Sequence, residues 1–230
     1  MKTVLAIETS SPALSVALGT SAGRIKEFHS SSSLKHSENL IPLIDRLLRG
    51  EGIALGDIDA FAIDRGPGSF TGLRIGFSLL KGFLVAKKKP CYGALSLDMI
   101  AAKVRLAEGC RLGVVIDARR EEIYSRFYRF RKGERVAERK LELLSLSELI
   151  TRVSNRTALA GDALVRYRQP LEKEFGNQIL FLDEKYQFPS ARTLVSWFQA
   201  QDGRLTALKA PGDFIPLYFR ASEAEEKIRK

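Results

Sequence analysis

The sequence predicts an α/β protein made of two duplicated domains. The chain has 230 residues, of which 45% are hydrophobic, so it can bury one large core or two small ones. Each half opens with the same pattern of strand, tight turn, strand, turn and strand, and then becomes helical in period. Because such internal similarity indicates duplication, we expect a first domain at 1–107 and a second at 108–230, joined by a short linker.

The first strands are indicated by short apolar runs separated by turn residues. Residues 4–7 form one apolar run, 14–18 alternate between apolar and polar, and 24–29 supply a third strand. The Thr-Ser-Ser-Pro cluster at 9–12 and the Ser-Ala-Gly cluster at 21–23 contain typical turn residues. These three strands are expected to form an antiparallel meander.

Two helices and a strand follow in the first half. Leucine and isoleucine residues between 40 and 48 recur at helical spacing, which predicts a helix over 37–49 that ends at Gly50. Pro42 should kink this helix or lie near its first turn. A strand at 60–64, a Gly-Pro-Gly loop and a long helix from about 70 to 86 complete the pattern.

The second half repeats this order. Strands are predicted at 112–117 and 123–128, with a polar turn between them, and a third strand follows Gly133. The sequence around 159–162 reads as a strand end that leads into a helix at Ala163. Residues 191–200 have a helical pattern and are expected to belong to this second domain.

Composition argues against several classes of protein. No stretch approaches the roughly 18 consecutive apolar residues of a membrane helix, so we expect neither a membrane span nor a signal peptide. Two cysteines and two histidines, without metal-ligand spacing, predict a cytoplasmic protein without a structural metal. The net charge of +10 lies mostly after residue 100. This surplus suits either RNA phosphates or an acidic partner, and it also suits an ordinary solvated surface.

The most informative segment is the glycine-rich run at 66–76, which reads GPGSFTGLRIG. It lacks the Gly-Lys-Ser/Thr end of a P-loop, and its third glycine comes one residue too late for a dinucleotide loop. Ser69 is well placed to cap a helix, and the preceding glycines permit a sharp entry from the strand before it. The segment therefore predicts a helix start rather than a nucleotide site.

The helix that follows is apolar on two sides. One row contains Leu73 and Phe77, and another contains Ile75, Leu79 and Phe83. Gly72 and Gly76 lie four residues apart on one face, which permits close approach of another backbone. The pattern fits a helix enclosed in its own domain and a helix at a subunit interface equally well.

Two corners between strands, at 8–11 and 117–121, occupy the positions where a two-domain ATPase of the actin and sugar-kinase type would hold phosphates. Backbone approach to phosphate usually calls for glycine, whereas the second corner carries arginine and glutamate. Glu8 and Asp117 fit hydrogen-bonded turn acceptors better than general acids or bases, although both roles stay open.

Taken in order, the motifs resemble those of the TsaB (YeaZ) family along nearly the whole chain. They are LAIETSSPALSVAL, HSENLIPLIDRLL, GPGSFTGLRIG, GALSLDMIA, VVIDARREEIY, LAGDAL and PLYFR. The resemblance implies two domains of the actin, sugar-kinase and heat-shock-ATPase type, which are ribonuclease H-like, with the second one reduced. Glu8 departs from the aspartate that is common in the family's first corner.

The resemblance also implies a role in making threonylcarbamoyladenosine beside the tRNA anticodon. In that role the chain is a cytoplasmic, non-catalytic scaffold that binds the catalytic TsaD subunit and helps to recruit the small ATPase TsaE. It would homodimerise when alone, and tRNA would be reached through the complex. TsaD's metal-binding histidines are absent at 93–97, so no metal, cofactor or catalytic residue is expected.

Family members pair with TsaD through helices of the first domain, which favours the interface reading. The residues expected to form that interface are Leu40, Leu43, Leu47, Phe70, Gly72, Leu73, Ile75, Gly76, Leu79 and Phe83. A bulky side chain at Gly76 should then block assembly while the monomer stays folded. The alternative is a stand-alone ATPase or metal-dependent hydrolase that uses the two strand corners.

Overall fold

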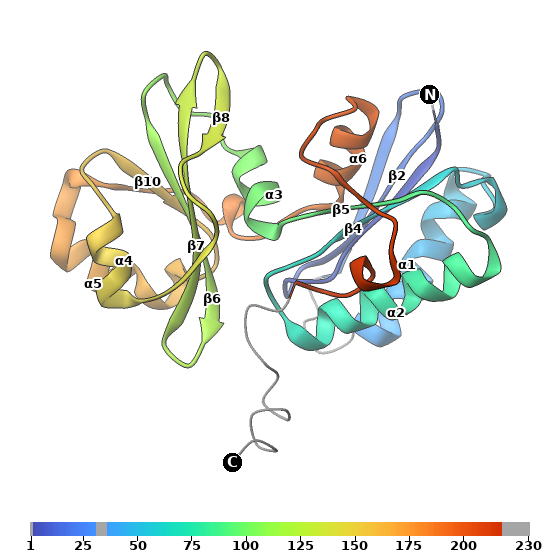
Figure 1. Cartoon of the computed structure of the whole chain (residues 1–230), viewed down its shortest axis with the longest axis horizontal. Helices are drawn as coiled ribbons and strands as arrows, with labels where there is room; N and C mark the ends of the chain where they lie inside the picture. Colours follow the sequence, from blue (N-terminus) through green and yellow to red (C-terminus); the bar gives the residue numbers. More distant parts are fainter. Residues whose placement is uncertain (1, 31–35, 218–230) are drawn as a thin grey trace. The chain divides into compact units, whose positions relative to one another are not determined.

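The structure is a computed structural model that describes residues 2–30 and 36–217 (Figure 1). It contains two β-sheets, each covered by its own helices. Contacts between backbone positions divide the chain into two compact units. Unit 1 combines Met1–Ser96 with Ser190–Lys230, and unit 2 is the continuous segment Leu97–Pro189.

Unit 1 is built on a six-stranded sheet with the order β12-β5-β4-β1-β2-β3. Strands β1, β4 and β5 run parallel, whereas β2, β3 and β12 are antiparallel to their neighbours. The strands are β1 (Val4–Glu8), β2 (Leu14–Gly19), β3 (Ile25–Ser30), β4 (Ala60–Asp64), β5 (Cys91–Ala94) and β12 (Thr206–Leu208). The helices are α1 (His36–Gly50), α2 (Phe70–Ala86) and α6 (Ala191–Gln199), with 3-10 turns at Leu55–Asp57 and Pro211–Asp213.

Both faces of the central strands are buried, which explains why β1 and β4 are apolar up to the acidic residue that ends each of them. Helices α1 and α2 cover one face, and α6 lies across β1, β2, β3 and β4 on the other (Figure 1). Leu5 and Ile7 belong to the same core cluster as Leu40 and Phe77 of the two covering helices. Alternate residues of each strand therefore serve the two helical layers.

Unit 2 repeats this plan with the strand order β11-β10-β6-β7-β8, and β9 also pairs with β7. Strands β6 and β10 run parallel, as do β10 and β11, while β6, β7 and β8 form an antiparallel meander. The strands are β6 (Arg111–Arg119), β7 (Glu122–Arg131), β8 (Glu134–Ala137), β9 (Glu142–Ser145), β10 (Thr157–Ala160) and β11 (Leu180–Phe181). The helices are α3 (Ser96–Lys103), α4 (Leu146–Arg152) and α5 (Leu164–Phe175), with 3-10 turns at Gly176–Gln178 and Glu184–Tyr186.

The two sheets share one topology: an antiparallel meander followed by two parallel strands on the other side of the first strand. This confirms the predicted duplication of ribonuclease H-like α/β domains. Unit 2 also has two packed faces, because Val115 and Phe127 pack among residues of α4 and α5, while Leu112 and Val114 pack among residues of α3.

The unit boundaries differ from the predicted division at residue 107. Each half ends in a helix that joins the other unit: α3 follows β5 but groups with unit 2, and α6 follows β11 but groups with unit 1. Burial is the physical reason, since each sheet needs an apolar cover on its second face. The predicted domain at 108–230 therefore contains a segment that completes the first sheet.

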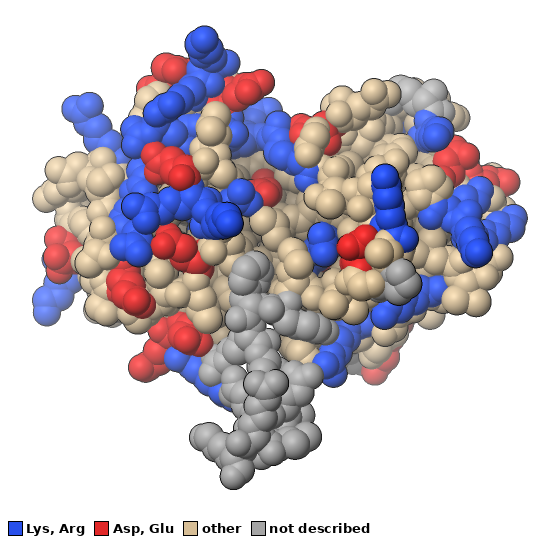
Figure 2. Space-filling model, in the orientation of Figure 1, with Lys and Arg blue, Asp and Glu red and all other residues tan. Residues whose placement is uncertain are grey.

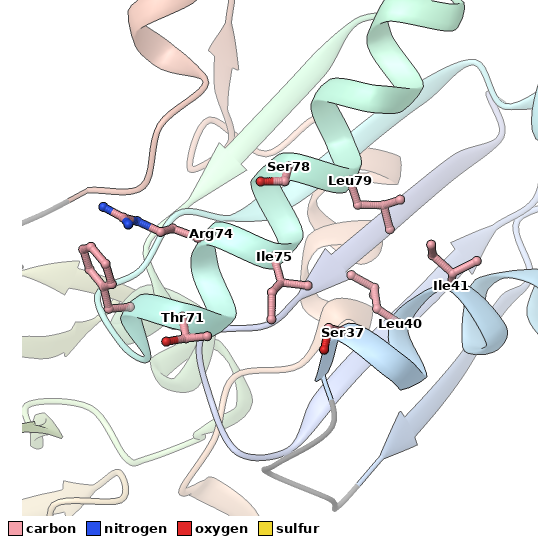
Figure 3. A pocket seen from close by; sticks show the side chains of 9 residues that line it. Ser37, Leu40, Ile41, Thr71, Arg74, Ile75, Ser78 and Leu79 are labelled. Atoms are coloured by element: carbon pink, nitrogen blue, oxygen red, sulfur yellow. The ribbon is translucent and has the colours of Figure 1, made fainter.

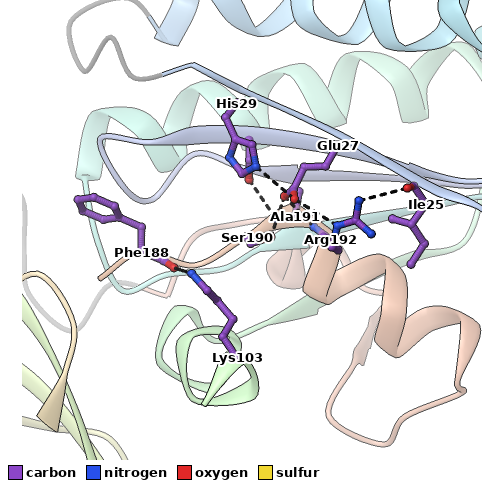
Figure 4. A network of polar contacts seen from close by, with 9 residues as sticks. Ile25, Glu27, His29, Lys103, Phe188, Ser190, Ala191 and Arg192 are labelled. Atoms are coloured by element: carbon purple, nitrogen blue, oxygen red, sulfur yellow. Dashed lines mark hydrogen bonds and ion pairs between the residues drawn. The ribbon is translucent and has the colours of Figure 1, made fainter. Parts of the chain in front are cut away.

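Polar contacts fix the start of α6 against unit 1 (Figure 4). The Ser190 hydroxyl donates to the Glu27 carboxylate at 2.7 Å, and the Arg192 backbone N–H donates to the same oxygen at 3.0 Å. The Ala191 N–H donates to the Ser15 hydroxyl at 2.9 Å, in a buried position on β2. These bonds place the helix on the sheet face that its apolar residues cover.

Among residues 2–30 and 36–217, none of the helices combines the length and the apolar character needed to cross a membrane.

Candidate functional site

A groove on the surface of unit 1 runs between α1 and α2 (Figure 3). Its volume is about 550 Å³. The lining is mostly apolar, with a few hydroxyl groups and one guanidinium at the edge. The lining residues are Ser37, Leu40, Ile41, Phe70, Thr71, Arg74, Ile75, Ser78 and Leu79. Such a groove suits an apolar side chain of a partner better than a charged metabolite.

The groove exists because neither helix places all of its apolar residues on the sheet. In α1, Leu40 and Ile44 are buried, while Ile41 is 59% exposed. In α2, Ile75 and Leu79 are only partly buried at the edge of the core. At one end the Arg74 guanidinium lies 3.8 Å from the centre of the Phe70 ring, and this cation–π contact orders both side chains.

The predicted interface residues fall into three groups. Leu40, Phe70, Ile75 and Leu79 line the groove. Leu43 and Phe83 are half-buried against the core of unit 1. The remaining four are buried in unit 1: Leu47, Gly72, Leu73 and Gly76. Those four support the helices from within and offer no side chain to a partner.

The close approach predicted for the two helical glycines is made by the chain itself. A Cβ at Gly72 would collide with the backbone oxygen of Thr9, and a Cβ at Gly76 would collide with the Thr9 hydroxyl. The expectation that a bulky residue at Gly76 would leave the monomer folded is therefore unsupported. The glycines allow α2 to lie directly on the turn after β1.

Sequence reasoning missed Ile41, the most exposed large apolar side chain of the groove. The signal was present, because Ile41 is an apolar residue outside the stripe that buries α1. An isolated apolar residue on a helix surface is common, and only the position of α2 shows that this one borders a groove.

A second feature of unit 1 is a buried polar cluster at the carboxyl ends of its parallel strands. Glu8 ends β1 and Asp64 ends β4, and both side chains are fully buried. Glu8 accepts bonds from the backbone N–H groups of Ser10 and Ser11 at 2.7 and 3.0 Å. Asp64 accepts bonds from the Ser96 hydroxyl at 2.7 Å and from a backbone N–H at 2.8 Å.

The Ser10 hydroxyl lies between the two carboxyl groups, 2.9 Å from Glu8 Oε1 and 2.7 Å from Asp64 Oδ2. A hydroxyl carries a single proton, so it can donate to only one of these oxygens at a time. A proton on Asp64 Oδ2 would satisfy both contacts, because Asp64 would donate to Ser10 and Ser10 to Glu8. A proton on Glu8 Oε1 would satisfy them equally, so the geometry favours one proton shared by the pair.

Burial supports this proton count. Removal from water raises the pKa of Glu8 well above its ordinary value, and the nearby charge of Asp64 raises it further. Burial likewise raises the pKa of Asp64 from 3.8 to about 6. The pair titrates as a coupled system and keeps a proton at mildly acidic pH. Both groups are closed off from solvent and bonded to the chain, so the cluster fixes the turn after β1.

The corresponding corner of unit 2 is built differently. The Asp117 backbone N–H donates to the Asp162 carboxylate at 3.0 Å, and burial raises the pKa of Asp162 to about 6. Arg119, Arg120 and Glu121 all have positive φ angles, of 64°, 49° and 65°. Within the described parts of the chain, no group of three or more histidine, cysteine, aspartate or glutamate side chains is placed to hold a metal ion.

Comparisons with known proteins agree on one family. A family model described as "TsaD: tRNA N6-adenosine threonylcarbamoyltransferase" matches residues 30–227. The tRNA threonylcarbamoyladenosine biosynthesis protein TsaB of Bacillus subtilis is 27% identical over 228 residues, covering 98% of this chain and 97% of that protein. TsaB of Haemophilus influenzae is 35% identical over 123 residues, which span 53% of this chain and 52% of that protein.

A solved structure gives the same result in three dimensions. YeaZ from Pseudomonas aeruginosa superposes with a TM-score of 0.76 at 28% identity, covering 95% of this chain and 100% of that chain. Both units are thus represented in a known relative. By family model, sequence and structure, the chain belongs to the TsaD family and, within it, to the TsaB (YeaZ) group.

Proposed function

We propose that the chain is a cytoplasmic accessory subunit of the machinery that makes threonylcarbamoyladenosine in tRNA, and that the groove between α1 and α2 receives a TsaD-like catalytic subunit. Relatives that carry the TsaB name are described as proteins of this biosynthesis. The observation that carries the docking proposal is the groove itself, in which Leu40, Ile75 and Leu79 form the floor and Ile41 stands exposed at the side.

A non-catalytic role fits the chemistry of the strand corners. The carboxyl groups of Glu8 and Asp64 are fully buried and already bonded to serine hydroxyls and backbone N–H groups. A general base must lie within hydrogen-bond reach of a substrate proton, and neither group faces an opening. The transfer chemistry would then belong to the TsaD-like partner, and the chain would also help to recruit a TsaE-like ATPase.

The docking proposal is tested by placing a charge in the groove. The variant Ile41→Asp puts a carboxylate where an apolar partner surface would remove it from water, which is unfavourable for binding. Capture of a co-expressed TsaD-like subunit should weaken at least about tenfold, equivalent to roughly 1.4 kcal/mol. Isothermal titration calorimetry of the purified subunits measures the loss.

Val85→Asp is the matched control, because Val85 lies on α2, is 88% exposed and does not line the groove. This variant should bind like the wild type. Equal binding by all three proteins would contradict the docking site. The isolated chain should also form a homodimer through the same groove, so sedimentation should show more monomer for Ile41→Asp than for Val85→Asp.

The rival function, a stand-alone ATPase or metal-dependent hydrolase, makes a separate prediction. The isolated chain would then bind ATP with magnesium tightly and turn it over without any partner. Calorimetry and a phosphate-release assay on the purified chain distinguish the two functions, since an accessory subunit should give neither tight binding nor turnover.

A further inference from the structure

The β7–β8 hairpin of unit 2 and the residues that follow it carry an excess of positive charge. Residues 129–140 contain six lysine and arginine residues against two glutamates. Strand β8 is the edge strand of its sheet, so one side of the hairpin faces no further strand. Figure 2 shows many lysine and arginine side chains over this region, with acidic side chains among them.

Some of these cations already have partners in unit 2. Arg111 and Arg129 both bind the Glu138 carboxylate, at 2.6 and 2.7 Å. The Arg135 guanidinium donates to the backbone oxygen of Val104 at 3.0 Å. These three arginines are thus held close to the sheet, and at the tip the Lys132 N–H donates to the Glu108 carboxylate at 3.0 Å.

Four other cations point outward: Arg131, Lys132, Arg139 and Lys140 are all exposed. Glu134 is directly opposite Arg131 in the strand register, but across residues 2–30 and 36–217 no ion pair within 4 Å involves any of the four. Exposed like charges repel one another, so a neutralising partner would be bound favourably.

The register places the four cations along one edge. Arg131 is opposite Glu134 at the tip, and Tyr128 is opposite Ala137 three residues further along. The Glu138 N–H then donates to the Phe127 oxygen at 2.9 Å, which keeps the next residues beside β7. Arg139 and Lys140 lie between Glu138, beside Phe127, and Glu142, which pairs with Ser125. At about 3.3 Å per residue of β7, they are therefore roughly 13–20 Å from the tip.

We propose that this basic edge, defined by Arg131, Lys132, Arg139 and Lys140, binds the phosphate backbone of RNA directly. A line of exposed cations matches a chain of phosphates, and release of the counterions around RNA favours such contacts. Arginine also binds phosphate through two parallel hydrogen bonds, and half of the edge is arginine. The inference goes beyond the docking proposal, because it concerns unit 2 and does not depend on the groove.

RNA is favoured over a membrane surface by the apolar content of the edge. Charge alone contributes about 1 kcal/mol per lysine or arginine at an anionic membrane, and stable binding also uses apolar side chains that enter the lipid. Val136, 47% exposed, is the large apolar residue available on β8. RNA is favoured over an acidic protein because the positive charge extends along a line rather than forming one pocket. Both rivals are included as arms of the test.

The test measures binding of the full chain to a fluorescently labelled tRNA transcript by anisotropy, from 50 to 200 mM NaCl. Four phosphate contacts predict that the Kd weakens roughly hundredfold across this range. The variant Arg131→Gln, Arg139→Gln, Lys140→Gln removes three of the four cations. Its slope of log Kd against log salt should be shallower by about two to three. Lys132, in the turn between β7 and β8, is left unchanged.

The matched control replaces three cations of unit 1, as Lys87→Gln, Lys88→Gln, Lys89→Gln, which removes the same charge from the end of α2. This control should keep the wild-type slope. Equal slopes for the two triple variants, or binding to poly-glutamate or phosphatidylserine vesicles as tight as to tRNA, would overturn the proposal. Aggregation of the Arg131→Gln, Arg139→Gln, Lys140→Gln variant with unchanged tRNA affinity would also overturn it. The cations would then serve to prevent the edge strand β8 from pairing with other chains.

Capture of a TsaD-like subunit is measured on the same two variants. It should be unchanged, so failure of the RNA edge and failure of the groove give different results. Circular dichroism and urea unfolding, recorded beside the binding data, identify any variant that does not fold.

Discussion

At the scale of single residues, the carboxyl groups of Glu8 and Asp64 show how tertiary structure changes chemistry. Each is an ordinary acid in the sequence, and each becomes fully buried with serine hydroxyls between and around it. Burial raises the pKa of both, because an ionised carboxylate loses its hydration. An acid whose pKa is higher in the folded state makes the fold less stable as the pH rises through that pKa.

Asp64 should therefore make the free energy of unfolding depend on pH. Its folded pKa is about 6, against 3.8 for the ordinary group, so its contribution is fully present below pH 4 and is lost as the pH rises through 6. The variant Asp64→Asn keeps a neutral donor facing Ser10. At pH 7.5 it should be more stable than the wild type, because it removes a buried charge that also raises the pKa of Glu8, and near pH 4 the difference should be smaller.

Urea unfolding of both proteins between pH 4 and 8 measures the difference. Asp162 also has a raised pKa of about 6 in unit 2, but it is present in both proteins and cancels in the comparison. A variant that is less stable than the wild type by the same amount at every pH would show that Asp64 is ionised throughout and that its charge is needed.

Part of this cluster was predictable. The corner at 8–11 predicts that Glu8 accepts hydrogen bonds from its own turn, as the structure has it. The contribution of Asp64 was not predictable, because it depends on the parallel pairing of β1 with β4, which joins residues about 56 apart. Periodicity identifies strands, but the register that brings their ends together is a property of the folded sheet.

At the scale of one element, α2 has the limits that the sequence predicts, Phe70–Ala86, with Ser69 as its cap. What the sequence left open was the surface that each face touches. The glycine face packs on the turn after β1, one apolar row enters the core, and the other partly lines the groove. Helical spacing shows that two faces are apolar, but it does not show which neighbour covers each of them.

Helix α2 allows the two roles of glycine to be compared within one element. Alanine is favoured over glycine in a helix by up to about 1 kcal/mol, so Gly82→Ala, which meets open space, should stabilise the protein by about that amount. In Gly72→Ala the new methyl group would meet the Thr9 backbone oxygen. Overpacking of this kind should destabilise the protein by about 1–3 kcal/mol.

Thermal and urea unfolding of both variants measure the two effects. Opposite signs are expected, although the same substitution is made in the same helix. Stabilisation by both substitutions would contradict the close contact between α2 and the turn, and would reopen the glycine face as a surface for a partner.

At the scale of the whole molecule, the helix that ends each half of the chain groups with the other unit. Helix α3 follows β5 of unit 1 but groups with unit 2, and α6 follows β11 of unit 2 but groups with unit 1. Duplication was predictable because it repeats local patterns. The exchange of the final helices was not predictable. Helix α6 has the amphipathic pattern of any surface helix, and that pattern does not indicate which sheet the helix covers.

Fragments of the chain should reflect the structural units. The continuous segment 97–189 contains its own sheet and two apolar clusters, so it should unfold cooperatively on its own. A fragment of residues 1–107 lacks α6, whose Leu194, Val195 and Trp197 are buried. Burial of three such side chains contributes about 5–9 kcal/mol, comparable to the total stability of a typical domain, so this fragment should not fold.

Circular dichroism and urea unfolding of the two fragments give the result. The control joins residues 1–96 to 190–230 through a flexible linker, and it should recover a cooperative transition. Cooperative unfolding of 1–107 alone would contradict the importance of α6 and would support the division at residue 107.

The discontinuity of unit 1 also sets the order in which the protein can fold during its synthesis. The segment 1–96 leaves the ribosome first, yet its second sheet face stays bare until residues 190–199 have been translated. At about 5–20 residues per second, that delay lasts roughly 5–20 s. The segment 1–96 is made first but needs α6, which is made late, to cover its sheet. A nascent chain would therefore expose β1 and β4 to chaperones throughout that interval.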